Sequence, residues 1–321
     1  MNFKKIINDK ALICIFVALA ASTLMLGSTL FLLDISRSSD DELRKFRIAK
    51  LTEPTAVSTI IIGDSSAGAA LNSSLFSKLS DRSTKNLSLT VDDGIVGSYL
   101  MLEKALAVHP EIETVIIMQT ADVWRKHFSS EAYFELTRRP DFWPGQTRFS
   151  SSTSLIDFMA YATDLHRPLR VINYAAKKVF NPQWRISVDP ELEQVTQLPE
   201  TFAGGQLQVE PSFRLSRTME PVQISSFKMI DQLCARRSLR CVFLFGPIHE
   251  AVIKNSPAEL AEIIHNVTEI AKHIKVIQTV LLLKNEQVGD TINHVLPAYK
   301  DKITEKIYRI IENDLASTDR K

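Results

Sequence analysis

The chain lacks an excess of charge of either sign, and no tract is rich in lysine or arginine. Its 321 residues include 38 basic and 37 acidic side chains, for a formal net charge of +1. Proteins that bind nucleic acid normally present a basic patch or stripe to the phosphates. The composition therefore argues against nucleic acid as a partner.

Motifs that hold a cofactor are missing as well. No group of histidine, cysteine and acidic residues shows the spacing of a metal site. Glycines number only ten, and the turn "GDSSAG" at residues 63–68 is neither a G-x-G-x-x-G fingerprint nor a P-loop. We expect no metal, nucleotide or flavin cofactor.

One apolar run is long. Residues 11–33 carry no charge and are long enough to cross a hydrocarbon core of ~30 Å as a helix. Lys4, Lys5 and Lys10 precede this run, whereas acidic residues offset the basic ones after it, so residues 1–10 should be cytoplasmic. A cleavable signal peptide is the alternative, but its apolar region would be shorter and followed by a small-x-small site. We expect a single-pass protein of the inner or plasma membrane, with residues 34–321 in the periplasm or another extracytoplasmic space.

The three cysteines fall into two groups. Cys14 lies within the apolar run, whereas Cys234 and Cys241 flank "ARRSLR" in the exported part, where oxidation is permitted. We expect these two at the end of a helix and the start of the next strand. A disulfide and two buried free thiols both fit this arrangement.

After a polar stalk over residues 34–55, apolar strand-like runs alternate with helical patterns through a domain at residues 56–321. This alternation predicts βαβ units and a parallel sheet, an α/β fold. About 100 residues, 125–222, interrupt the pattern after the third strand, and an insertion of this length usually forms a lid or a binding surface. The predicted strands cover residues 57–63, 85–91, 112–120, 239–248 and 276–283.

Polar residues follow each predicted strand, at the edge where an open parallel sheet binds its ligands. They are Asp64 and Ser65 after the first strand, Gly94 after the second, Asp122 after the third, His249 after the fourth, and Asp290 and His294 after the fifth.

Three of these residues form a set suited to covalent catalysis. A serine hydroxyl is a weak nucleophile until a base takes its proton, and histidine is the usual base. An acid then holds the imidazole in the productive tautomer. Ser65, Asp290 and His294 supply this set, with His249 as a second candidate base; Asp64 suits a structural role in the turn.

The stretch "IIIGDSSAG" at residues 60–68, with Asp290 and His294 just before the last predicted helix, resembles the SGNH (GDSL-type) hydrolase superfamily. The resemblance covers residues 57–122 and 223–314. It implies a three-layer α/β fold with a flavodoxin-like sheet, with Ser65 as nucleophile, His294 as base and Asp290 as its orienter. Together with the predicted anchor, the layout is similar to bacterial envelope and exopolysaccharide acylation proteins, such as the alginate-acetylation and teichoic-acid D-alanylation families.

The chain departs from the family pattern in two blocks and has only a nearest candidate for a third. Gly94 is the nearest candidate for the glycine that donates an oxyanion-hole amide in the second block. In the third block, Gly-x-Asn-Asp, the chain reads "QTAD", so Ala121 replaces the oxyanion asparagine while Asp122, which also suits a cap of the next segment, is kept. Losing one such donor typically costs ~100- to 1000-fold in rate. Finally, Asp290 precedes His294 by four residues rather than three.

Two functions follow from the resemblance. The first is a membrane-anchored serine acyl esterase or O-acyltransferase, of O-acetyl type, acting on a cell-envelope or secreted polysaccharide, with a membrane partner presenting the acyl group in the case of transfer. The second is a catalytically degenerate scaffold that binds glycan or assembles with polysaccharide biosynthesis or export machinery. Trp124, Trp143 and Trp184 are either sugar-stacking or buried residues.

Overall fold

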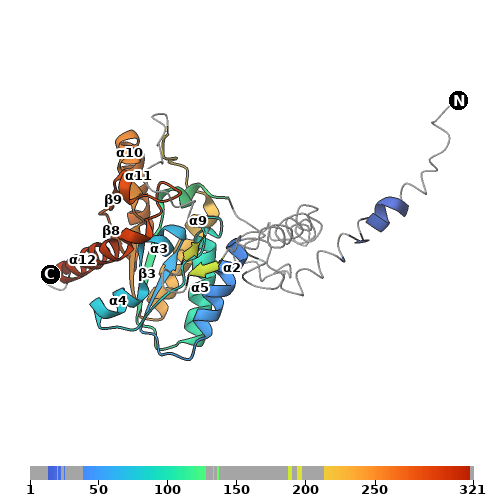
Figure 1. Ribbon diagram of the computed structural model, residues 1–321, viewed down its shortest axis with the longest axis horizontal. Coiled ribbons are helices and arrows are strands. Elements are labelled where there is room, and N and C mark those ends of the chain that lie inside the picture. The colour runs from blue at the N-terminus through green and yellow to red at the C-terminus, as the bar shows by residue number, and fades with distance from the viewer. Residues whose placement is uncertain are drawn as a thin grey trace.

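The computed structural model describes residues 39–127 and 213–318 continuously (Figure 1). Shorter described pieces cover residues 14–19, 21–22, 25, 133, 136, 187–189 and 194–196. Among all these residues, no helix is both long and apolar enough to cross a membrane. The predicted span over residues 11–33 lies mostly outside the described part of the chain.

The domain is built on a five-stranded sheet in the order β2-β1-β3-β6-β8, in which every neighbouring pair is parallel. Numbered along the chain, this order is 2-1-3-4-5, as in flavodoxin-like sheets. The predicted α/β class and parallel sheet are confirmed. The strands are β1 (Thr59–Gly63), β2 (Thr84–Asn86), β3 (Thr114–Gln119), β6 (Arg240–Phe245) and β8 (Lys275–Ile277).

Successive side chains of a strand point to opposite faces of the sheet. Because those on both faces are apolar here, helices cover both faces. In β1, Ile60 and Ile62 join one apolar cluster, whereas Ile61 joins the other. The first cluster includes residues of α5 (Gly94–Val108), α9 (Pro221–Arg236) and α11 (Pro257–Ile270). The second includes residues of α3 (Ser65–Ala70), α4 (Ser73–Ser80) and α12 (Lys300–Thr318). Figure 1 shows α4 and α12 on one side of the sheet, opposite α5 and α9.

The expected stalk is largely part of the domain. Residues Ser39–Thr52 form α2, which contacts α5 and β2, and its Leu43 and Leu51 are buried. Arg47 is fully buried on the same side of this helix, and it donates hydrogen bonds to the carbonyls of Ser88 (3.0 Å) and Asn86 (2.8 Å). Burial lowers the pKa of this guanidinium to about 9. The contacts fix α2 against the sheet.

Two predicted elements divide in the structure. The helical pattern after Ser65 breaks into α3 and α4, because the side chain of Asn72 accepts from the amides of Ser74 and Leu75 and so caps a new helix. The predicted strand over 276–283 ends early, at Ile277. Its last part forms β9 (Leu282–Leu283), which pairs with the short β7 (Ile248–His249) outside the main sheet.

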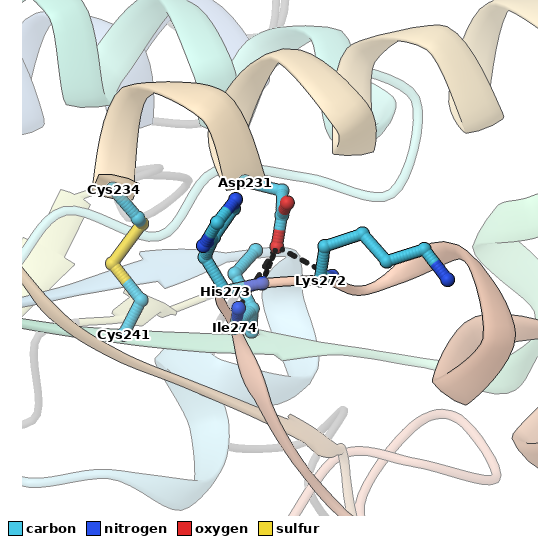
Figure 2. Close-up of a disulfide and its surroundings, with 6 residues drawn as sticks. All are labelled: Asp231, Cys234, Cys241, Lys272, His273 and Ile274. Atoms are coloured by element: carbon cyan, nitrogen blue, oxygen red, sulfur yellow. Dashed lines mark hydrogen bonds between the residues drawn. A yellow bond between two sulfur atoms is a disulfide. The ribbon is translucent and has the colours of Figure 1, made fainter. Parts of the chain in front are cut away.

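A disulfide joins Cys234 in α9 to Cys241 in β6, the pairing that the sequence left open (Figure 2). Near it, one carboxylate oxygen of Asp231 accepts hydrogen bonds from the amides of Lys272, His273 and Ile274, at 2.8 to 3.0 Å. Asp231 thereby ties α9 to the chain that enters β8.

Little of the insertion is described. Within it, β4 (Ser187–Asp189) and β5 (Gln194–Thr196) form an antiparallel pair, with β4 beside α2 and β5 beside α3. Part of the insertion therefore lies against the helix that begins at Ser65. Trp143 and Trp184 lie outside the described residues.

Candidate active site

The site begins where β1 ends, at Gly63. This glycine has φ +155°, and a Cβ placed on it would lie 1.8 Å from the carbonyl oxygen of Met118 in β3. Any side chain would therefore push the two strands apart. Glycine allows β1 to turn sharply at the edge of the sheet and to deliver the next residues to that edge.

Asp64 holds this turn. The carboxylate is fully buried and accepts hydrogen bonds from the Ser66 amide (2.9 Å), the Ser66 hydroxyl (2.6 Å) and the Thr120 amide (2.7 Å). Burial raises the pKa of Asp64, while the hydrogen bonds oppose the rise. Asp64 therefore links the turn after β1 to the end of β3 and has a structural role.

Ser65 is the first residue of α3 and is partly exposed, whereas its neighbours Asp64 and Ser66 are buried. Its Oγ lies 2.8 Å from Nε2 of His294. Within the described residues, the Ser65 amide has no hydrogen-bond partner. A free amide next to the hydroxyl is placed to stabilise negative charge on a bound carbonyl oxygen.

A short loop supplies the base and the acid. Val288 and Val295 form an antiparallel bridge, and the Gly289 amide donates to the His294 carbonyl at 2.8 Å. The loop between them brings Oδ1 of Asp290 to 2.7 Å from Nδ1 of His294. The four-residue spacing is thus compatible with a direct contact between the two side chains.

The electrostatics match the roles that such a set needs. The hydrogen bond from His294 lowers the pKa of Asp290, with a smaller contribution from the charge of the imidazole, while burial opposes the shift. An ionised Asp290 accepts a hydrogen bond from a protonated Nδ1 of His294. The unprotonated Nε2 of the same ring can then accept a hydrogen bond from the Ser65 hydroxyl. The arrangement can activate Ser65 as a nucleophile.

The alternative base, His249, is engaged elsewhere. It is buried, its Nδ1 accepts from the Ala251 amide at 3.0 Å, and its Nε2 bonds Oδ1 of Asn285. Its imidazole therefore caps α10 (Glu250–Asn255). Neither ring nitrogen is free to take a proton from a substrate or nucleophile.

Gly94 and Asp122 do not join the Ser65–His294–Asp290 set. The Gly94 amide donates to the Val91 carbonyl at 3.2 Å, so it is not free for an oxyanion. The position needs glycine for another reason: its φ is +62°, and a Cβ there would lie 2.8 Å from the side chain of Gln223. Asp122, in the 3-10 turn η2 (Ala121–Arg125), pairs with Arg125.

Trp124 does not offer a sugar-stacking surface. Its side chain is fully buried, with ring centroids 5.4 Å from Phe227 and 6.2 Å from Phe243. It belongs to the core between the sheet and α9.

A small, mainly apolar hollow lies at the carboxyl ends of β3 and β6, beside the loop that carries Asp290 and His294. It has room for about one water molecule. Gly246, after β6, brings the hollow near Ser66, since a Cβ on this glycine would lie 2.2 Å from the Ser66 hydroxyl. The sequence analysis did not select Asn293. The only feature that could have pointed to it was its position next to the candidate base, His294. The hollow is lined by Thr120, Ala121, Phe245, Gly246, Pro247, Ile248, Leu260, Val280 and Asn293.

Within the described part of the chain, no cluster of three or more histidine, cysteine or acidic residues is arranged to hold a metal ion. No protein-family model matches the chain, and no curated protein matches it.

Proposed function

We propose that this protein is a serine acyl-transfer enzyme of SGNH type. The observation that carries the proposal is the hydrogen-bonded series from Ser65 through His294 to Asp290, at 2.8 and 2.7 Å. The strand order of the sheet and the turn that begins with Gly63 support the same assignment.

In the proposed reaction, His294 Nε2 takes the proton of Ser65 as Oγ attacks an ester carbonyl. Asp290 stabilises the imidazolium, which then protonates the leaving alcohol. The acyl-serine passes to water in an esterase or to a sugar hydroxyl in a transferase. In either case, His294 activates the second nucleophile as it activated the first.

The substrate we propose is an acylated cell-envelope or secreted polysaccharide. The predicted anchor over residues 11–33 would place the domain outside the cytoplasm, where such glycans are modified. For the transfer reaction, a membrane protein would present the acyl group, because the sequence carries no motif for an acyl cofactor.

A glycan-binding scaffold without activity is the second candidate. Two observations favour it: Ala121 offers no polar side chain at the expected asparagine position, and the Gly94 amide is used in a turn. The contact between Ser65 and His294 favours the enzyme, because a scaffold has no need to keep it.

A serine-reactive fluorophosphonate separates the two candidates. With the full chain in detergent, we expect labelling of the wild type and its loss in Ser65→Ala. Ser74→Ala is the matched control, because Ser74 is an exposed serine one helix further along. Labelling that is absent from the wild type, or unchanged in Ser65→Ala, would favour the scaffold.

A further inference from the structure

The proposed acyl transfer, on which this inference rests, needs hydrogen-bond donors for the oxyanion that forms on the substrate. The Ser65 amide is one donor without a partner among the described residues. The two other positions expected from the resemblance do not contribute, because the side chain of Ala121 has no donor and the Gly94 amide is already bonded to Val91. A second donor must come from elsewhere.

The hollow at the ends of β3 and β6 shows where that donor lies. Ala121 lines it, so this is the space that the missing asparagine would have faced. Asn293, from the loop between Val288 and Val295, lines the same hollow and is the one lining residue with a side-chain N–H. The Thr120 hydroxyl, buried without a partner among the described residues, is the other side-chain donor there. Most of the remaining lining is apolar, and a donor in such surroundings interacts strongly with developing charge.

Bonds to its neighbours set the orientation of Asn293. Its Oδ1 accepts from the Thr291 hydroxyl at 2.6 Å, which leaves Nδ2 as the end of the carboxamide available to a ligand. The amide of His249 donates to the carbonyl of Ile292 at 2.7 Å and thereby fixes the backbone just before Asn293. The donor is therefore held in place before a substrate binds.

The hollow borders the two chain neighbours of the proposed nucleophile. Thr120, one of its lining residues, donates its amide to Asp64 at 2.7 Å, and Gly246, another, packs against Ser66. Asp64 and Ser66 are the residues directly before and after Ser65 in the chain. Asn293 also directly precedes His294, whose Nε2 contacts the Ser65 hydroxyl.

We propose that the Asn293 side-chain amide is a catalytic oxyanion donor, acting with the Ser65 amide and replacing the group that Ala121 lacks. During attack, the carbonyl double-bond electrons move to the oxygen, and Nδ2–H of Asn293 donates to that oxygen. The bond is released when the carbonyl re-forms and the alcohol leaves.

The test measures Ser65-dependent hydrolysis of p-nitrophenyl acetate by the full chain in detergent. Asn293→Leu keeps the approximate volume and removes the donor, so kcat should fall by ~100- to 1000-fold while KM changes little. Asn313→Leu, at an exposed position on α12, is the matched control and should keep wild-type kcat. Thermal unfolding of all variants checks that the loss of kcat is not a loss of fold.

A rescue variant makes the test specific. Ala121→Asn, added to Asn293→Leu, returns an amide to the same hollow and should restore part of the lost kcat. An unchanged kcat in Asn293→Leu, or a rise in KM alone, would overturn the role of Asn293 and leave the proposed function standing. Wild-type hydrolysis that does not depend on Ser65 would instead overturn the proposed function.

Discussion

Ser65 Oγ and His294 Nε2 lie 2.8 Å apart although 229 positions separate the two residues in the chain. The contact joins the turn after the first strand to the loop that follows the last one. Any change that alters the imidazole of His294 therefore acts directly on the hydroxyl of Ser65.

Asp290→Asn should lower kcat strongly with little change in stability. The amide would favour the wrong tautomer of His294 and would not stabilise the imidazolium, a loss of ~10²- to 10⁴-fold for a partly exposed acid of this kind. Steady-state kinetics with p-nitrophenyl acetate measures the effect. Asp301→Asn, at an exposed acid in the first turn of α12, should leave kcat unchanged.

Asp64→Asn should destabilise the domain at acidic pH. The new Nδ2 would face the Thr120 amide, donor against donor, and one buried amide would lose its acceptor, at a cost of about 1–3 kcal/mol. Urea unfolding at pH 4 compares the two proteins.

The same pair of proteins tests the linkage of Asp64. Its pKa is raised in the folded state, so the folded protein binds the proton more tightly than the unfolded chain. The contribution of Asp64 is therefore full below the unfolded pKa of about 3.9 and is lost as pH rises through the folded pKa. The stability advantage of wild type over Asp64→Asn should shrink over that rise. A stability advantage of wild type that grows with pH would contradict a raised pKa for Asp64.

Lys50→Met should flatten the stability profile at alkaline pH. Burial, with the charge of Arg47 next in importance, lowers the pKa of Lys50 to about 7, far below the value of about 10.4 in an unfolded chain. Between these two values the unfolded chain binds more protons, so the free energy of unfolding rises with pH. Urea unfolding at pH 7 and pH 10 should show a smaller rise in Lys50→Met than in wild type. Lys78→Met, on α4, is the control and should keep the wild-type rise.

Removal of the disulfide should destabilise the domain without abolishing the site. Cys234 and Cys241 are seven positions apart, and closing so short a loop is worth about 2–3 kcal/mol in the chain-entropy account. Urea unfolding of the Cys234→Ser/Cys241→Ser double variant, with Cys14→Ser as control, measures the loss. A Ser65-dependent activity that disappears while the protein is still folded would show that the bridge also shapes the site.

The central strands were predictable because β1, β3 and β6 are continuous apolar runs, as strands buried on both faces must be. The helix α2 was not recognised as part of the core. Its buried face carries Leu43, Arg47 and Leu51 at helical spacing, and the arginine in the middle makes the stripe look polar. The buried guanidinium of Arg47 donates hydrogen bonds to two carbonyls from another part of the chain, a compensation that the sequence does not reveal.

For the site as well, the sequence identified residues by type and position but not those whose role depends on three-dimensional contacts. Ser65, Asp290 and His294 were selected as candidates from residue type, order and position relative to the strands, and the structure brings their side chains into contact. Asn293 was not selected, because the role proposed for it rests on two geometrical facts: its place in the hollow and the hydroxyl of Thr291 that orients it. Gly94 looked available in the sequence, but the turn after Val91 uses its amide.

The docking of α2 also limits how far the domain can travel from an attached membrane. If residues 11–33 span the bilayer as the sequence predicts, only residues 34–38 remain between the span and a helix that is part of the folded body. A fully extended chain covers at most ~3.6 Å per residue, so this tether reaches less than ~20 Å. If the substrate is the polysaccharide proposed above, a domain on so short a tether would act on it close to the membrane surface, and polymer further out would be beyond its range.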